Sequence, residues 1–480
     1  MYVTHKHLRG SSIPLCFSVV LQAGMNELVY GLIGQPYRCP RETSKGGLGS
    51  RSDDVSGVPS CPIERHYHDG NTPMTDSMPK ILDGVTVLDL STFVTGGFCS
   101  SMLANQGAEV LKVEQPGYGD AIRHSGPPFI NGQSPYYWTV NYGKRSIELD
   151  LKNEQARETL YELVEEADIF IQNYRPGVDE KLGIDYETIN EHNDEIIYLA
   201  ISAFGQTGPW SKRSGYGLLI QGMSGIMSVT REEGRQPVKV GLPMTDLITS
   251  MWAAFGAMSA LYRRESTGQG EYIDLGMLES ALPWLTKQAG QVFADREPKR
   301  MGTKDPVLAP YQTLETKDGF INICILNEKL WGELCEVLDR PDLPADERFE
   351  TNADRVDHLD ELEAEIEATL ADKTTDEWIE IIAEEGGIPA GPVYDVEEAL
   401  NNPQIDARGT ISEIEHPEIG TIPVIEHPLK FENAESGFES PPPMLGEHNR
   451  DILEELGYSE AEIDEMVDAG VFGDPDDVDE

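Results

Sequence analysis

Asp246 is the residue of this chain whose type and surroundings most clearly suggest chemistry. It lies in the segment KVGLPMTDLITS (residues 239–250), at the head of a long apolar run, although carboxylates are usually exposed to water. In the first turn of a helix it would accept backbone N–H bonds and stabilise the helix by about 1 kcal/mol. The same position keeps a carboxylate ionised and places backbone donors nearby, as a nucleophile with an oxyanion hole requires. Both interpretations are open for the residue on its own.

Other nucleophiles and metal ligands have weaker support in the sequence. It contains no G-x-S-x-G and no H-E-x-x-H motif, so serine hydrolase and zinc peptidase chemistry are not indicated. Three of the six cysteines lie within residues 1–77, and Cys99, Cys324 and Cys335 are scattered without metal-ligand spacing. This pattern predicts no metal site and a reducing, cytoplasmic location.

Basic residues follow two of the predicted strands. Lys152 comes between the strand-like run SIELDL and a helical segment, and Asn173-Tyr174-Arg175 follows ADIFIQ, with Lys181 six residues after Arg175. In a parallel sheet both groups would lie at the carboxyl edge, where open α/β sheets bind ligands. Bases at helix starts suit a phosphate-bearing ligand, and Tyr174 could face an adenine ring. Ordinary surface ion pairs are the alternative.

The elements that would position these residues form an alternating pattern. Runs typical of buried strands occur at 85–90, 108–114, 146–151, 167–173 and 195–204, and helical runs occur at 98–107 and 154–166. The β-α-β order predicts an α/β, Rossmann-like sheet. The first turn has only Gly96-Gly97 in place of G-x-G-x-x-G, so a dinucleotide site is weakly indicated. A further helix is predicted to open at Asp246 and to end at Thr267-Gly268.

The domain organisation follows from changes in composition. We expect a large α/β domain at 78–300, a smaller α+β domain at 301–400, a segment at 401–472 that returns to the large domain, and an acidic tail at 473–480. One capping box is expected at 374–377 and another at 459–462. Residues 1–77 show no sustained period and are predicted to be a disordered extension, or to precede the true start at Met74 or Met78.

The charge of the chain limits its partners. The sequence has 85 Asp+Glu against 37 Lys+Arg, for a formal net charge of −48. This balance excludes a nucleic-acid interface and disfavours an anionic membrane surface. It is typical of proteins kept soluble by acidic hydration in molar salt, where the Debye length is about 3 Å and self-repulsion is screened.

With these motifs in order, the chain resembles the class III CoA-transferases from about Leu82 to Phe472. The likeness is carried by LDGVTVLDLS, GAEVLKVEQPGYGD, KRSIELDLK, NYRPG, ISAFGQTGP, GLPMTD, STGQGEYIDLGMLE, GIPAGPV and LGEHNRDIL. The resemblance implies that Asp246 is the catalytic nucleophile, that CoA thioesters are substrates with no tightly bound cofactor, and that two protomers form an interlocked, ring-like homodimer. The residues it implies for CoA binding are Val94, Thr95, Leu149, Lys152, Asn173, Tyr174, Arg175 and Lys181.

Two departures from the family pattern bear on the substrate. Formyl-CoA transferase-like members have Gln at the position of Val94, and their run of four glycines is replaced near here by MGTKDPVLAPYQ. The first difference argues against a formyl or oxalyl substrate, and the second leaves open which segment forms the lid over Asp246. The aromatic residues Tyr136, Tyr137, Trp138 and Tyr216 predict a roomier pocket. Similarity to salt-adapted members favours succinyl-CoA as donor and a small C4 or C5 dicarboxylic acid, such as mesaconate, as acceptor.

Two other functions are considered. The 2-methylacyl-CoA racemases resemble the same family but use a His in a Gly-His-Asp motif, where this chain has Gly215-Tyr216-Gly217. Phenols ionise only near pH 10, so a tyrosine is a poor base at neutral pH. A non-catalytic CoA-binding or NAD-binding protein would keep the basic groups but would not need a carboxylate at position 246.

Overall fold

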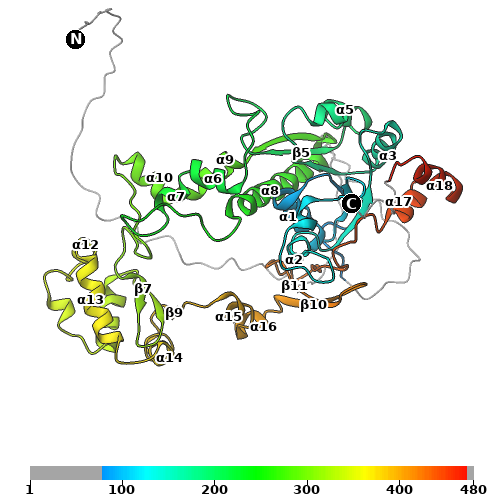
Figure 1. Ribbon diagram of the computed structural model, residues 1–480. Coiled ribbons are helices and arrows are strands. Elements are labelled where there is room, and N and C mark those ends of the chain that lie inside the picture. Colours follow the sequence, from blue (N-terminus) through cyan, green and yellow to red (C-terminus); the bar gives the residue numbers. More distant parts are fainter. Residues whose placement is uncertain (1–77, 473–480) are drawn as a thin grey trace, which may run out of the picture. The chain divides into compact units, whose positions relative to one another are not determined.

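A six-stranded parallel sheet is the central element of the computed structural model, which describes residues 78–472 (Figure 1). Its strand order, β3-β2-β1-β4-β5-β6, is that of a Rossmann-like sheet, so the predicted α/β class is confirmed. The strands are β1 Thr86–Asp89, β2 Glu109–Glu114, β3 Lys144–Glu148, β4 Ile169–Gln172, β5 Ile197–Ser202 and β6 Glu271–Gly276. The predicted extension at 1–77 and the tail at 473–480 lie outside the described residues.

Helices cover both faces of this sheet because successive side chains of each buried strand point in opposite directions. Val87, Ile169 and Leu199 pack against α1 (Phe93–Asn105) and α8 (Met244–Thr267). Their neighbours Leu88 and Phe170 pack on the other face. The helices on that face are α3 (Glu154–Glu165), α5 (Tyr186–His192), α17 (Asn449–Glu455) and α18 (Glu460–Asp468). The central strands β4 and β5 therefore read as nearly continuous apolar runs, as expected for a buried parallel sheet.

The Gly96-Gly97 pair has a packing role at the start of α1. A Cβ atom on Gly96 would lie 2.2 Å from the Cβ of Ser91, so only glycine allows α1 to approach the end of β1 this closely. The carbonyl of Gly97 accepts a hydrogen bond from the buried ammonium of Lys144 at 2.9 Å. The pair thus brings the N-terminus of α1 close to the carboxyl edge of the sheet.

Residues 309–388 build a second hydrophobic core around an antiparallel sheet. Its strands are β7 Tyr311–Glu315, β8 Phe320–Cys324 and β9 Ala390–Pro392, and its helices are α11 Glu328–Val337, α12 Asn352–Asp357, α13 Leu359–Leu370 and α14 Thr375–Ile379. Arg355 is fully buried, pairs with Glu328 at 2.9 Å and lies over the ring of Trp331. The capping box predicted at Thr374 and Glu377 is confirmed, as is the one at Ser459 and Glu462.

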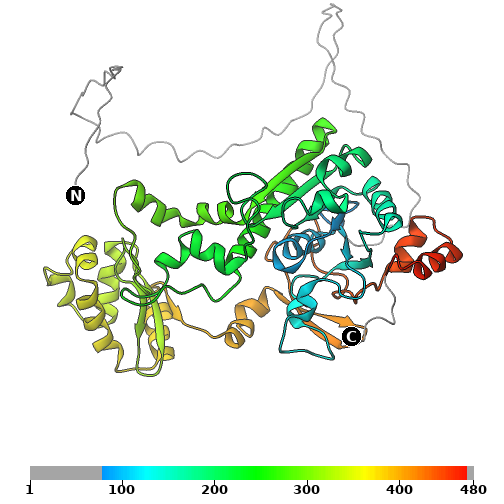
Figure 2. The same cartoon turned by 45° about the horizontal axis from the view of Figure 1, so that its top comes forward.

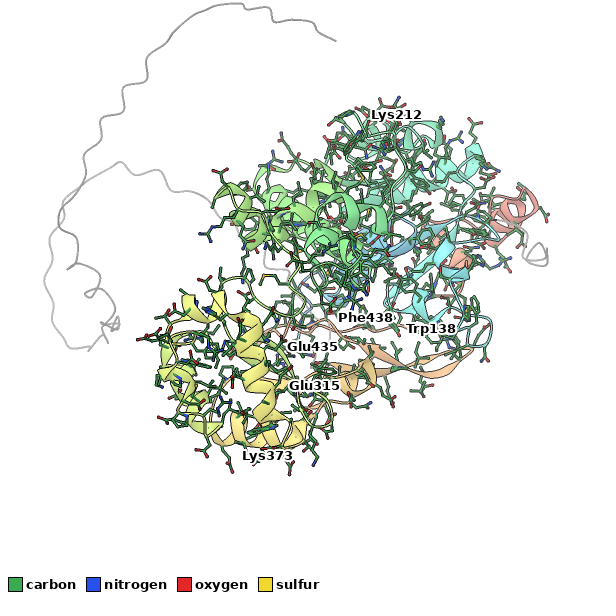
Figure 3. The ribbon with its side chains drawn as sticks, turned by 60° about the vertical axis from the view of Figure 1, so that its left-hand side comes forward. Trp138, Lys212, Glu315, Lys373, Glu435 and Phe438 are labelled. Carbon is green, nitrogen blue, oxygen red and sulfur yellow. The ribbon has the colours of Figure 1, made fainter. Side chains whose placement is uncertain are left out.

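The chain then passes through α15 (Val396–Leu400) and α16 (Pro403–Ala407) to a hairpin of β10 (Ile411–His416) and β11 (Gly420–Ile425). Ile422 and Val424 of this hairpin belong to one hydrophobic cluster with Tyr137 and Trp138 of α2 (Pro135–Trp138). Figure 2 shows the hairpin in orange beside the cyan segment that contains α2. Farther along the chain, the centroid of the Phe438 ring lies 5.4 Å from that of Tyr142. Phe438 and Trp138 are both labelled in Figure 3.

The remaining described α-helices are short connections between these elements. They are α4 Asp179–Leu182, α6 Gly217–Met223, α7 Ile226–Val229, α9 Met277–Ala281 and α10 Thr286–Phe293. None of the helices at 78–472 combines the length and the apolar character that a membrane span requires.

Candidate functional site

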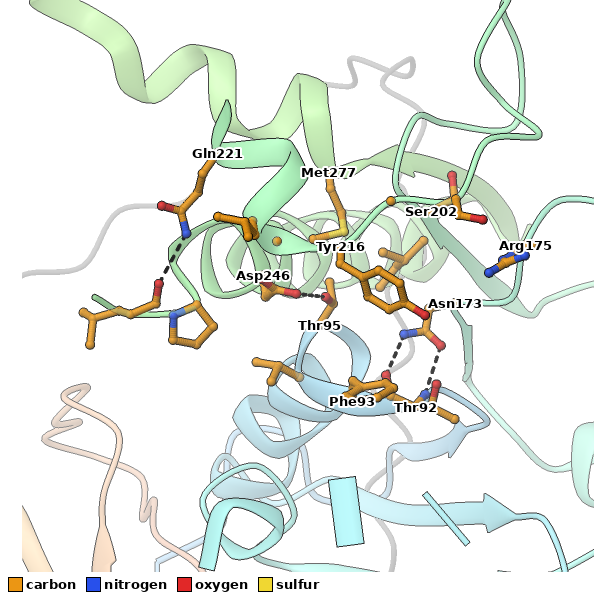
Figure 4. A pocket seen from close by; sticks show the side chains of 18 of the residues that line it. Thr92, Phe93, Thr95, Asn173, Arg175, Ser202, Tyr216, Gln221, Asp246 and Met277 are labelled. Atoms are coloured by element: carbon orange, nitrogen blue, oxygen red, sulfur yellow. Dashed lines mark hydrogen bonds between the residues drawn. The ribbon is translucent and has the colours of Figure 1, made fainter. Parts of the chain in front are cut away.

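A cavity of about 630 Å³ opens at the carboxyl ends of β1, β4 and β5 (Figure 4). The segments that follow these strands contribute Thr92, Asn173 and Ser202 to its wall, and the N-terminal residues of α1, α6 and α8 complete it. The carboxyl edge is where the sequence predicted the ligand site, and it is the usual binding edge of open α/β sheets.

Asp246 lies in the wall of this cavity on the first turn of α8. The helix begins at Met244, two residues before the predicted start, because Pro243 precedes it and the N–H groups of Asp246 and Leu247 both bond to the carbonyl of Pro243. No side-chain cap bond forms at this terminus. Pro243 at the N-cap position has no side-chain acceptor, so Asp246 is an acid of the first turn and not the N-cap residue, and it also lines the cavity.

Two hydroxyl groups hold the Asp246 carboxylate. Thr95 Oγ1 donates to Oδ1 at 3.3 Å, and Thr245 Oγ1 lies 3.5 Å from Oδ2. Burial raises the pKa of Asp246 above its ordinary value, and the bond from Thr95 partly opposes this. No ion pair joins Asp246 to a basic side chain among the described residues. A carboxylate with few partners in a partly desolvated wall is more reactive than one held by cations, because less stabilisation is lost when it attacks.

Tyrosine side chains form part of the same wall. The pKa of Tyr136 is raised by burial and by the charge of Asp246, which places its hydroxyl within electrostatic reach of the carboxylate. Tyr216 is 66% exposed, and its ring meets that of Phe93 edge-on at 6.5 Å. The prediction that Tyr137 and Trp138 line the pocket is wrong, because both are buried in the core under the β10–β11 hairpin.

The predicted CoA-binding residues divide into two groups. Five of them line the cavity: Val94, Thr95, Asn173, Tyr174 and Arg175. The other three lie outside its wall: Leu149 is buried with its N–H bonded to the carbonyl of Glu114, while Lys152 and Lys181 are exposed.

The side-chain amide of Asn173 fixes the loop between β1 and α1. Thr92 N–H donates to Asn173 Oδ1 at 2.9 Å, and Asn173 Nδ2 donates to the carbonyl of Thr92 at 2.7 Å (Figure 4). Asn173 thereby joins the segment after β4 to the loop that leads to Thr95. Its role toward CoA stays a prediction.

Several residues of the wall were not predicted from the sequence. Arg213 lies over the ring of Trp210 at 5.1 Å, and Gln221 is buried on α6 with Oε1 accepting from Val240 N at 2.9 Å. Lys239 lies at the start of the strap 239–243 that leads into α8. Only their positions in the sequence could have indicated them. Arg213 and Gln221 flank the GYG segment at 215–217, and Lys239 precedes the GLPMTD motif.

A buried ionic network supports the loop beneath the cavity. Lys112 Nζ lies 3.0 Å from Asp120 and donates to the carbonyl of Ser91 at 2.9 Å. Asp120 in turn accepts a hydrogen bond from the N–H of Phe93 at 2.8 Å. Phe93 has a φ of 60°, a backbone conformation that is strained for residues other than glycine. Such backbone strain persists only where the surroundings fix it. The network therefore holds the start of α1, and with it Thr95, in place.

The second buried lysine belongs to the same network. Lys144 Nζ lies 3.0 Å from Asp89, and burial lowers the pKa of Lys144 to about 8 despite the opposing charge of Asp89. No cluster of His, Cys, Asp and Glu suited to a metal ion occurs at 78–472.

Known proteins of similar sequence and structure agree with this fold. Residues 82–449 match the family described as CoA-transferase family III, and the chain belongs to that family. The family resemblance found in the sequence is thus confirmed, and the chain is an enzyme of the CoA-transferase class.

Two curated relatives and one solved structure illustrate the similarity. A succinyl-CoA:glutarate CoA-transferase of Mus musculus is 38% identical over 399 residues, covering 83% of this chain and 91% of the relative. A succinyl-CoA:mesaconate CoA-transferase of Haloarcula hispanica is 35% identical over 387 residues, covering 78% and 96%. The crystal structure of a CAIB/BAIF family protein from Brucella suis has a TM-score of 0.72 and 37% identity, covering 79% of this chain and all of that one.

Proposed function

We propose that this enzyme transfers CoA from succinyl-CoA to a small dicarboxylic acid, with Asp246 as the covalent nucleophile. The observation that carries the proposal is the Asp246 carboxylate, partly buried and free of ion pairs, in the wall of a cavity at the ligand-binding edge of a family III CoA-transferase. The relatives named for succinyl-CoA support the donor.

The reaction proceeds by two exchanges at the carboxylate. An oxygen of Asp246 attacks the thioester carbonyl, the C–S bond breaks, and a mixed anhydride and CoA thiolate form. The thiolate then attacks the aspartyl carbonyl, which releases succinate and leaves an aspartyl-CoA thioester. The acceptor carboxylate attacks that thioester in the same way, and the thiolate returns to the acceptor's carbonyl. Asp246 is regenerated, and no net proton is consumed.

The acceptor that we favour is a five-carbon dicarboxylate. Glutarate, mesaconate and citramalate, which are named for relatives 32–38% identical to this chain, all have five carbons and two carboxylates. Mesaconate remains our specific proposal, and glutarate is the principal competitor. The cavity of about 630 Å³, with Tyr136 and Tyr216 in its wall, has room for such acids beside the thioester.

A panel of acids tests the proposal. The protein would be incubated with succinyl-CoA and each of glutarate, mesaconate, citramalate, oxalate and carnitine at high salt, and new acyl-CoA products would be identified by mass spectrometry. Thioesters of the five-carbon dicarboxylates support it. Products with carnitine or oxalate alone would refute the substrate assignment, and no product with any acid would refute the proposed transfer between succinyl-CoA and a dicarboxylate.

We also propose that the enzyme is a homodimer. Large apolar side chains of α8 and α10 are exposed in the single chain, among them Phe255 at 66%, Tyr262 at 84% and Phe293 at 86%. Surfaces of this kind usually mark an interface. Light scattering at high salt should give twice the mass of one chain, and a monomer at micromolar concentration would contradict the proposal.

A further inference from the structure

The wall of the cavity has a charge opposite to that of the chain. Among its lining residues are three cations, Arg175, Arg213 and Lys239, and a single acid, Asp246, whereas the whole chain has 85 acids against 37 bases. A positive cavity in so negative a protein concentrates anionic ligands. We expect the CoA phosphates to bind some of these cations. Another of them would then contact the carboxylate at the far end of the acyl group.

The position of Lys239 separates it from the predicted CoA contacts. Figure 4 shows Arg175 and Gln221 on opposite sides of Asp246. Arg175 follows β4 with Asn173, where the resemblance places CoA. Gln221 binds the strap before α8: its Oε1 accepts from Val240 N at 2.9 Å, and Val240 directly follows Lys239. A thioester bound with its CoA toward Arg175 would extend its acyl group past Asp246 toward this strap.

The strap gives Lys239 a defined position. Besides the bond to Val240, Gln221 Nε2 lies 3.4 Å from the carbonyl of Leu242, so one buried side chain contacts the strap at two points. The strap ends in Pro243, whose carbonyl accepts two N–H groups of the first turn of α8. Lys239 and Asp246 are thus connected by a short segment fixed at both ends.

The charge of Lys239 is available for a ligand. Lys239 lines the cavity, and no ion pair joins it to Asp246 or to another acid among residues 78–472. The ammonium therefore lies apart from the nucleophile rather than neutralising it. This suits a cation for the far end of a substrate whose near end reacts at Asp246.

We infer that Lys239 binds the distal carboxylate of the acyl group, in the succinyl donor and in the dicarboxylic acceptor alike, and so determines the preference for dicarboxylates. This inference rests on the proposed function. Lys239 is exposed in the free chain, and a charge-assisted hydrogen bond from its ammonium favours a second carboxylate over a methyl group, by about 10- to 100-fold in kcat/KM.

Matched substrates isolate this contact. Butyryl-CoA replaces the distal carboxylate of succinyl-CoA by a methyl group, and valerate does the same for glutarate. The measured quantity is the ratio of kcat/KM for each pair, with the wild type, Lys239→Met and Lys239→Arg. Lys212→Met is the control, because Lys212 is an exposed neighbour of Arg213 that does not line the cavity (Figure 3).

We expect the preference for succinyl-CoA over butyryl-CoA, and for glutarate over valerate, to fall at least 10-fold in Lys239→Met. Lys239→Arg should retain part of the preference, and Lys212→Met should match the wild type. An unchanged ratio in Lys239→Met would overturn the inference, as would an equal loss with all substrates, which would assign Lys239 to CoA itself. A wild type that transfers CoA but prefers monocarboxylates also overturns it, whereas a wild type that transfers no CoA refutes the proposed function first.

Discussion

The backbone of Gly217 lies directly against the carboxylate of Asp246. A Cβ atom on Gly217 would be 2.3 Å from Oδ2 of Asp246, a separation that non-bonded atoms do not adopt. Gly217 is the last residue of the Gly215-Tyr216-Gly217 segment, where racemases of similar sequence carry a Gly-His-Asp motif. In this chain position 217 must stay free of a side chain because the nucleophile lies against it, and the segment offers the racemase alternative only the phenol of Tyr216, a poor base at neutral pH.

Gly217→Ala is therefore expected to displace the nucleophile. Because a misplacement of about 1 Å at a reacting group costs on the order of 100-fold in rate, we predict a fall in kcat of that size. Gly222→Ala on the same helix is the matched control, since the nearest atom to its added Cβ would be Met227 Sδ at 3.6 Å. Steady-state assays of both variants check this, and equal activities would contradict the close contact.

Thr95→Val should change the pH dependence of the reaction. Asp246 must be ionised to attack, and burial raises its pKa while the Thr95 hydroxyl lowers it. Removing the hydroxyl therefore raises the pKa further, so the acid limb of kcat/KM should move to higher pH. The fractional loss of activity should be greater at acid pH than at neutral pH. A pH profile with its acid limb unmoved, or moved to lower pH, would show that Thr95 does not stabilise the ionised carboxylate.

Lys112→Met should destabilise the fold strongly. Burial alone would lower the pKa of Lys112, but the charges of Asp120 and Asp89 raise it above its ordinary value, so the ammonium is retained. Removing it leaves the buried carboxylate of Asp120 without its ion-pair partner, while Asp89 keeps Lys144 at 3.0 Å; breaking a buried pair in this way typically costs about 3–5 kcal/mol. The control is Lys329→Met, whose i,i+4 pair with Glu333 is exposed and contributes less than about 1 kcal/mol. Denaturant unfolding at constant salt measures both, and similar values would contradict the network.

Salt should be required for activity. With a formal net charge of −48, the folded chain repels itself strongly in dilute buffer. Molar KCl shortens the Debye length to about 3 Å and screens this repulsion. Activity and melting temperature should therefore fall together as KCl is dialysed away and recover when it is restored. Full activity and an unchanged melting temperature in dilute buffer would refute adaptation to salt.

The sequence predicted five of the six strands of the sheet because those strands are largely buried, whereas β6 alternates between half-buried and exposed residues and was not predicted. Runs such as VTVLDL and ADIFIQN have no polar face, which identifies a parallel sheet before the strand order is known. It also predicted the edge at which Asn173 and Arg175 lie. It placed the start of α8 two residues late because Pro243 belongs to the cap and not to the loop.

Other features depend on tertiary contacts that spacing does not reveal. Trp138 looked like a pocket residue, but a hairpin almost 300 residues later in the chain covers it. The pairing of Lys112 with Asp120 requires that β2 and the loop after it fold back beneath α1. Gln221 has no motif of its own, and its function appears only when the strap it binds is placed beside α6.

A stable variant without the nucleophile is needed to test the central claim. Burial of Asp246 raises its pKa, which means that the ionised form is disfavoured in the folded protein relative to water. At any pH where Asp246 is ionised in the folded protein, Asp246→Asn removes this cost and should be at least as stable as the wild type. Loss of transfer in Asp246→Asn and Asp246→Ala would then reflect loss of the nucleophile and not unfolding.

The most direct measurement is to trap the covalent intermediate. The enzyme would be treated with borohydride or hydroxylamine during turnover of succinyl-CoA, digested, and analysed by tandem mass spectrometry. The account predicts that the modification is found on Asp246, that it requires the thioester, and that Asp246→Asn shows none and transfers no CoA. Modification of another residue, or wild-type turnover by Asp246→Ala, would contradict it.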